Sequence, residues 1–183
     1  MSELDDLRAQ VRELSDREAI RDVLTTFATA MDAQDWELLA SVWTDDATFD
    51  RRRQGPLTAE DGTGRVWRGK QEVMAQLVAG VSQHFTSHHV LANHRITLDG
   101  DRARAVSYMQ SVHLDDPTKP ADHGGKGGWY LTELARTADG WQIARLWHTP
   151  VWFAGTMQPT GPVTAEDVQE LRTQLRGAGS PVG

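Results

Sequence analysis

The chain has 183 residues, of which 39% are hydrophobic and 25% charged, as is typical of one soluble globular domain. A formal net charge of -7 gives no attraction for nucleic acid or an anionic membrane surface, and the absence of cysteine excludes disulfides, thiolate nucleophiles and cysteine-held metals. The N-terminus has no apolar leader segment, so we expect a cytoplasmic protein with no nucleic-acid and no membrane partner.

Hydrophobic spacing predicts helices in the first half of the chain. A short amphipathic helix over residues 1–14 is indicated by apolar residues spaced three and four apart: Leu4, Leu7, Val11 and Leu14. The motif SDRE at 15–18 fits a capping box, which predicts that a new helix begins there and ends near Asp32. A carboxylate at that end is unexpected, because the helix dipole disfavours negative charge there. Asp35 caps a further predicted helix, WELLASVW, and another is expected over 70–81.

Strand patterns follow from about residue 86. Asp99-Gly100 and Asp139-Gly140 each lie between two alternating segments, which predicts two β-hairpins. Loops are expected over 55–64 and 115–128, and a last helix over 164–177. Helices followed by antiparallel strands predict an α+β fold, with the helices on one face of a curved sheet. We therefore divide the chain into an N-terminal amphipathic helix (1–14), one domain (15–155) and a C-terminal helix with a loose tail (156–183).

Three segments together resemble a known family. AIRDVLTTFATAMDAQDWELLASVWTDDATFD, HHVLANHRITLDGDRARAVSY and DGWQIARLW, in this order and spacing, resemble the SnoaL-like branch of the NTF2-like superfamily. Within it the chain is most similar to scytalone dehydratase and hexachlorocyclohexane dehydrochlorinase. The resemblance implies a cone-shaped α+β barrel, in which a curved antiparallel sheet and helices enclose a deep, mainly apolar pocket. It also implies no cofactor, a small hydrophobic cyclic substrate, and a homo-oligomer, either a trimer or a dimer.

The resemblance implies a catalytic pair. In those lyases an aspartate at the end of the first long helix pairs with a histidine on a strand, and the matching residues are Asp32 and His89. Adjacent strand residues point to opposite faces, so His88 is expected to face the other side. A histidine held by a carboxylate can remove a proton from carbon, which predicts a lyase that eliminates water or acid. An isomerase or polyketide cyclase with the same pair stays open, as does a non-catalytic ligand-binding protein or dioxygenase small subunit.

Two further candidates depend on strand register. His113 resembles a second active-site histidine of scytalone dehydratase, which makes it a catalytic candidate. A two-residue turn at Asp99-Gly100, however, places Tyr108 on the His89 side and His113 on the other. A single β-bulge in either strand reverses this assignment. Tyr108 is the candidate donor to a substrate oxygen, with sheet packing as its alternative role.

The remaining substrate-binding candidates are Asn93, Arg145, Met31 and Phe27. Arg145 is expected either to enter the pocket as an anion stabiliser or to lie on the outer face. Met31 and Arg51 stand where scytalone dehydratase has tyrosines, and Phe27 where the dehydrochlorinase has a lysine, so neither specific activity is carried over.

Two alternatives to these site assignments are set aside. The arginine run at 51–53 is interpreted as a solvated loop. Because alternation splits the adjacent histidines at 88 and 89 across two faces, no metal site is predicted.

Overall fold

The computed structural model describes residues 2–51, 66–157 and 165–177. The loop predicted over 55–64 and the tail after residue 177 lie outside these ranges. None of the described helices combines the length and apolar character needed to cross a membrane. The elements in chain order are α1 (Glu3–Ala33), α2 (Trp36–Ser41), β1 (Trp43–Asp50), β2 (Val66–Arg68), α3 (Lys70–Val81), β3 (Thr86–Asp99), β4 (Arg102–Leu114), β5 (His123–Thr137), β6 (Gly140–Gly155) and α4 (Ala165–Gly177).

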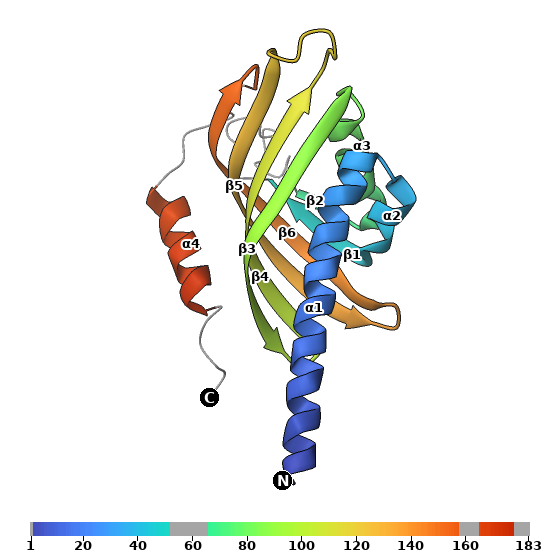
Figure 1. Cartoon of the computed structure of the whole chain (residues 1–183), viewed down its shortest axis with the longest axis vertical. Coiled ribbons are helices and arrows are strands. Elements are labelled where there is room, and N and C mark those ends of the chain that lie inside the picture. Colours follow the sequence, from blue (N-terminus) through green and yellow to red (C-terminus); the bar gives the residue numbers. More distant parts are fainter. Residues whose placement is uncertain (1, 52–65, 158–164, 178–183) are drawn as a thin grey trace.

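A single mixed sheet forms the centre of the molecule. Its strand order is β2-β1-β6-β5-β4-β3, in which only the β1–β6 pair is parallel. The sheet is strongly curved but not closed, since β2 and β3 remain at its edges. Helices α1, α2 and α3 lie on one side and α4 on the other (Figure 1). The predicted α+β fold is confirmed, as an open curved sheet rather than a closed barrel.

The N-terminal helix differs from the prediction. α1 is one continuous helix of 31 residues, capped by Ser2, so the predicted helix start at Ser15 and the boundary at residue 14 fall inside it. The region has no glycine or proline to break a helix, and an ion pair of 2.7 Å between Glu13 and Arg17 spans the predicted boundary. The helix ends as predicted beside Asp32, where Gln34 adopts a left-handed conformation with φ 53°.

Most of the other local predictions are confirmed. Asp35 caps α2 by accepting a hydrogen bond of 3.0 Å from the Leu38 amide, and α3 covers the predicted residues. Both hairpins form, with Gly100 and Gly140 at positive φ. The expected loop over 115–128 is shorter, because β5 already begins at His123. Its glycines have a packing role there, since a Cβ at Gly127 would lie 2.3 Å from the Trp152 ring.

Two apolar clusters hold the helices on the sheet. The larger joins α1, α2 and α3 to the inner face, with Phe27, Trp43 and Leu134 fully buried or nearly so. The smaller lies on the outer face, where Leu171 and Leu175 of α4 pack near Trp129 and Leu131. The inner cluster matters for function, because several of its members also line the cavity described below.

Candidate active site

Asp32 and His89 form a closely bonded pair between α1 and β3. Asp32 Oδ1 accepts hydrogen bonds from His89 Nδ1 at 2.7 Å and from Ser87 Oγ at 3.0 Å. Its Oδ2 accepts one from the His89 backbone amide at 2.7 Å. These three donors explain how a carboxylate is tolerated in the last turn of a helix. Only a protonated Nδ1 can donate to the carboxylate, so in neutral His89 the lone pair lies on Nε2.

The charge state of Asp32 suits this arrangement. Burial alone raises the pKa of Asp32, but the hydrogen bonds and positive charge of His89 and the bond from Ser87 outweigh it. The net effect holds the pKa of Asp32 below its ordinary value. Asp32 is therefore ionised near neutral pH and able to stabilise an imidazolium on His89.

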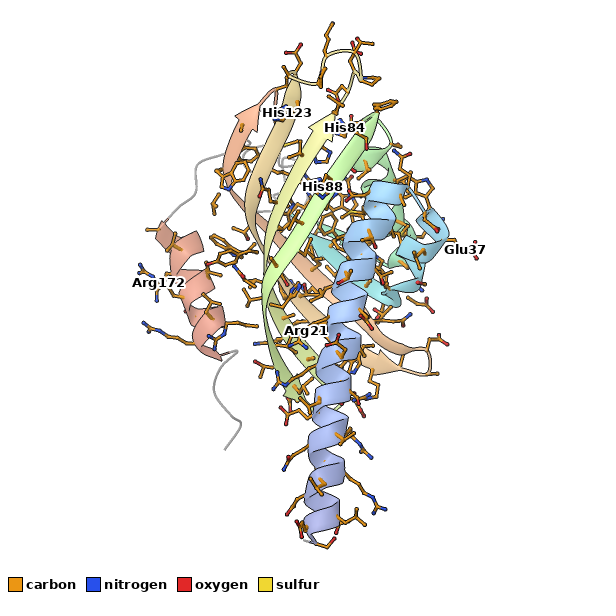
Figure 2. The ribbon with its side chains drawn as sticks, viewed as in Figure 1. Arg21, Glu37, His84, His88, His123 and Arg172 are labelled. Atoms are coloured by element: carbon orange, nitrogen blue, oxygen red, sulfur yellow. The ribbon has the colours of Figure 1, made fainter. Side chains whose placement is uncertain are left out.

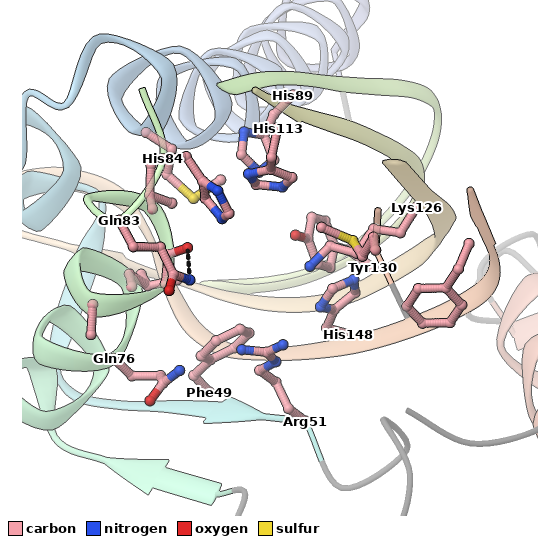
Figure 3. A pocket seen from close by; sticks show the side chains of 17 residues that line it. Phe49, Arg51, Gln76, Gln83, His84, His89, His113, Lys126, Tyr130 and His148 are labelled. Carbon is pink, nitrogen blue, oxygen red and sulfur yellow. Dashed lines mark hydrogen bonds between the residues drawn. The ribbon is translucent and has the colours of Figure 1, made fainter. Parts of the chain in front are cut away.

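His89 lines a cavity of about 320 Å³ between the sheet, α1 and α3 (Figure 3). The size is that of a site for a small organic molecule. Its wall combines apolar and polar side chains, and roughly half of the lining residues carry polar groups. The polar side chains are Arg51, Gln76, Gln83, His84, His89, His113, Lys126, Tyr130 and His148.

Two more histidines lie beside His89 in this cavity. The His113 ring makes an edge contact with His89, with centroids 5.3 Å apart, and lies 4.5 Å from His84. Burial, followed by the charges of Lys126 and nearby histidines, lowers the pKa of His113 to about 3, so it is neutral at physiological pH. His84 Nδ1 contacts Asp115 Oδ1 at 2.5 Å. A second histidine–carboxylate pair therefore adjoins the same cavity as the first.

A β-bulge determines which face each of these residues occupies. The β3–β4 register shifts between Ala92 and Arg95, where Asn93 has φ 54°. His89 consequently pairs with Ser111, and His113 shares its face. The predicted opposition of His113 and His89 is thus wrong, for the reason that a bulge reverses strand parity.

The same bulge removes two candidates from the site. Tyr108 lies on the outer face and is 50% exposed, so it cannot donate to a ligand in the cavity. Asn93 is exposed within the bulge itself. His88 is exposed on the face opposite His89, as predicted (Figure 2).

Another irregularity, between β5 and β6, decides between the two positions expected for Arg145. The register shifts between Glu133 and Leu134, so His148 lines the cavity and Arg145 lies outside it. The Arg145 guanidinium packs 4.0 Å from the Trp147 ring centre and pairs with Asp50 at 3.5 Å. Of the two positions expected for Arg145, the structure therefore shows the one outside the cavity.

Of the two candidates on α1, one lines the cavity and the other does not. Met31 lines the cavity, whereas Phe27 is fully buried behind it. Phe27 makes an edge contact with Tyr130, with centroids 5.8 Å apart, and so supports a lining residue. Arg51 also lines the cavity, which corrects its interpretation as part of a solvated loop.

Sequence reasoning missed Lys126, His84 and His148. Lys126 falls in the segment expected to be a loop, and strand β5 instead carries it into the cavity. Its sequence signal is a spacing of four residues from Tyr130, which places the two side chains on the same face of a regular strand. Within the described ranges, no three His, Asp or Glu side chains are grouped to hold a metal ion.

Burial of Lys126 has a consequence for stability. Burial, and then the charge of Arg51, lowers the pKa of Lys126 to about 7. Because the folded pKa lies below the unfolded one, the destabilising effect is fully present below pH 7 and is relieved as the pH rises toward 10. Lys126→Met should therefore raise the melting temperature at pH 6 and have a smaller effect at pH 9.

Thermal unfolding at several pH values measures this effect. Lys119→Met is the control, since Lys119 is exposed and pairs with Asp116 at 3.7 Å outside the cavity. Equal stabilisation by Lys126→Met at all pH values would show that packing, rather than charge burial, is responsible.

Comparisons with known proteins identify the family of the chain. The family model of the SnoaL-like domain matches residues 12–147. The chain belongs to the SnoaL-like family. An uncharacterized protein of Mycobacterium tuberculosis is 30% identical to this SnoaL-like protein over 145 residues, which are 78% of this chain and 90% of the relative.

Solved structures similar to this SnoaL-like protein share its fold. A Kribbella flavida protein has a TM-score of 0.67 at 23% identity, covering 78% of this chain and 95% of its own. A proposed scytalone dehydratase from Novosphingobium aromaticivorans has a TM-score of 0.68 at 16% identity. The match covers 82% of this chain and 95% of that protein. A hexachlorocyclohexane dehydrochlorinase from Novosphingobium barchaimii has a TM-score of 0.64 at 18% identity. The match covers 82% of this chain and 99% of that protein. At these identities the likeness establishes the fold alone.

Proposed function

We propose that this protein is a cofactor-independent lyase acting on a small cyclic molecule, with His89 as the general base. The observation that carries the proposal is the double attachment of His89 to Asp32, through its ring and its backbone, at the wall of a cavity. Two anchoring points fix both the tautomer and the orientation of the ring. Such fixing is what proton abstraction from carbon requires of a weak base.

The proposed reaction is an elimination. His89 Nε2 takes a proton from a carbon, the electrons of that C–H bond form a double bond, and a neighbouring C–O or C–halogen bond breaks. A halide leaves with its electrons unaided, whereas an oxygen needs a proton to leave as water. His84, paired with Asp115 at 2.5 Å, is the group placed to supply it.

The His84–Asp115 pair also favours one alternative. A second held histidine on the same cavity could return the proton to another carbon, which would make the enzyme an isomerase. The two reactions differ in mass balance, because an elimination releases water or acid and an isomerisation releases nothing.

Turnover of a panel of cyclic alcohols, halides and enones, followed by mass spectrometry, tests the proposal. A product lighter by water or acid supports the lyase, and a product of unchanged mass supports the isomerase or a cyclase. Turnover that is equal in wild type and His89→Gln would contradict both. Binding of panel members that neither His89→Gln nor Asp32→Asn alters, without turnover, would favour a non-catalytic role.

We also propose that the protein is a homo-oligomer joined through the start of α1. This segment extends beyond the sheet (Figure 1), and four of its apolar residues are more than half exposed. They are Leu4, Leu7, Val11 and Leu14, whose spacing of three, four and three residues is that of a coiled-coil seam. In a parallel pair, Glu3 of one copy would lie opposite Arg8 of the next, giving complementary charge beside the seam.

Disrupting this seam should dissociate the oligomer. The variant Leu7→Asp/Val11→Asp is expected to sediment as a smaller species than wild type, because it places charge between the paired helices. Ala9→Asp, on the opposite side of the same helix, is the control and should sediment as wild type. A monomeric wild type, or an unchanged size for the double variant, would contradict the proposal.

A further inference from the structure

The part of the cavity away from His89 and Asp32 is built from three cationic or titratable side chains on different segments. Lys126 comes from β5, His148 from β6 and Arg51 from the end of β1. In Figure 3 they converge around Tyr130, whose ring lies 4.9 Å from that of His148. We call this group the basic end of the cavity. Segments far apart in the sequence thus bring three basic side chains to one place.

The basic groups at this end disfavour one another's protonation. Among the described residues that line the cavity, none is an aspartate or glutamate. Burial, followed by the charges of Lys126 and Arg51, lowers the pKa of His148 well below its ordinary value. Burial, and then the charge of Arg51, likewise lowers the pKa of Lys126. A negative group entering the cavity would offset the effects of burial and of Arg51, and would so favour a protonated Lys126.

We propose that the basic end binds a carboxylate of the substrate, so that the substrate class is small cyclic organic acids. Lys126 is the main ligand, because an ammonium is a compact charge with three donors. Apolar side chains such as Phe49, Phe153 and Met157 also line the cavity, which suits the ring of such an acid. This inference rests on the proposed function: a carboxylate bound at the basic end would orient the ring so that one of its C–H bonds points toward His89, the proposed base.

A matched pair of probes tests the proposal without any turnover. Binding of 1-naphthoate and of 1-naphthamide, which have similar shapes but differ in charge, is measured by titration calorimetry. Wild type should prefer the carboxylate by about 10- to 100-fold, as expected for a charge-assisted hydrogen bond. Lys126→Met should reduce this preference to about twofold or less, whereas the exposed control Lys119→Met should keep it.

The outcomes separate this proposal from the lyase proposal. Equal binding of the two probes by wild type, no binding of either, or an unchanged preference in Lys126→Met would overturn the carboxylate site. The preference should persist in His89→Gln, because that residue lies at the other end of the cavity. If it persists while His89→Gln retains full turnover, the carboxylate site stands and the assignment of His89 as base fails.

Discussion

Replacing His89 with glutamine is expected to lower kcat/KM by about 10²–10⁴-fold, the usual contribution of a general base. Glutamine can keep a hydrogen bond to Asp32 but has no basic nitrogen to accept a proton. The fold should survive, because the ring lies at the cavity wall rather than in the apolar cluster. Steady-state kinetics on the substrate found in the panel measure the loss.

The neighbouring histidine provides a matched control. His88 is exposed on the opposite face of β3, so His88→Gln makes the same chemical change one residue away. It should leave kcat/KM unchanged. Equal losses in the two variants would mean that the strand, and not the base, was affected.

Asp32→Asn is expected to have an effect of similar size, together with a loss of stability. An asparagine amide would direct its NH₂ group toward either the His89 backbone amide or the protonated Nδ1, so one donor would lose its acceptor. The imidazole would then favour protonation on Nε2, which removes the basic lone pair from the cavity. We expect a fall in kcat/KM of about 10²-fold or more and a loss of about 1–3 kcal/mol in unfolding free energy.

The pH dependence of that loss follows from the lowered pKa of Asp32. A carboxylate whose folded pKa is depressed stabilises the fold above its unfolded pKa, and the stability is lost as the pH falls through the folded pKa. The difference between wild type and Asp32→Asn in urea unfolding should therefore shrink in acid. Asp22→Asn is the control for unfolding, because Asp22 is exposed on the same helix. In kinetics, the double variant Asp32→Asn/His89→Gln should have a kcat/KM no lower than that of the slower single variant.

Local sequence patterns were sufficient to predict features that depend on a single helix or turn. The spacing of apolar residues located α3, and glycines at the turns located both hairpins. Asp32 and His89 came from the family resemblance and from the position of Asp32 at a helix end. The false helix start at Ser15 arose because a capping motif fits the sequence, while uninterrupted helix-forming residues on both sides favour continuation.

Strand parity was not predictable in the same way. A bulge depends on how two strands and their neighbours pack together, so it leaves little trace in the period of one strand. Asn93 was the available signal, because asparagine is among the few residues that adopt positive φ readily. Because of the bulge beside it, His113 faces the cavity and Tyr108 faces away from it. Because of the register shift near Ala144, His148 faces the cavity and Arg145 does not.

The tautomer of His89 tests the central claim most directly, and it requires no substrate. Nitrogen-15 NMR of the histidine side chains at alkaline pH, with His89→Gln used to assign the signal, distinguishes a protonated Nδ1 from a protonated Nε2. We predict that neutral His89 carries its proton on Nδ1, bonded to Asp32, and that Asp32→Asn shifts it toward Nε2. A neutral His89 protonated on Nε2 in the wild type would contradict its assignment as a base held by Asp32.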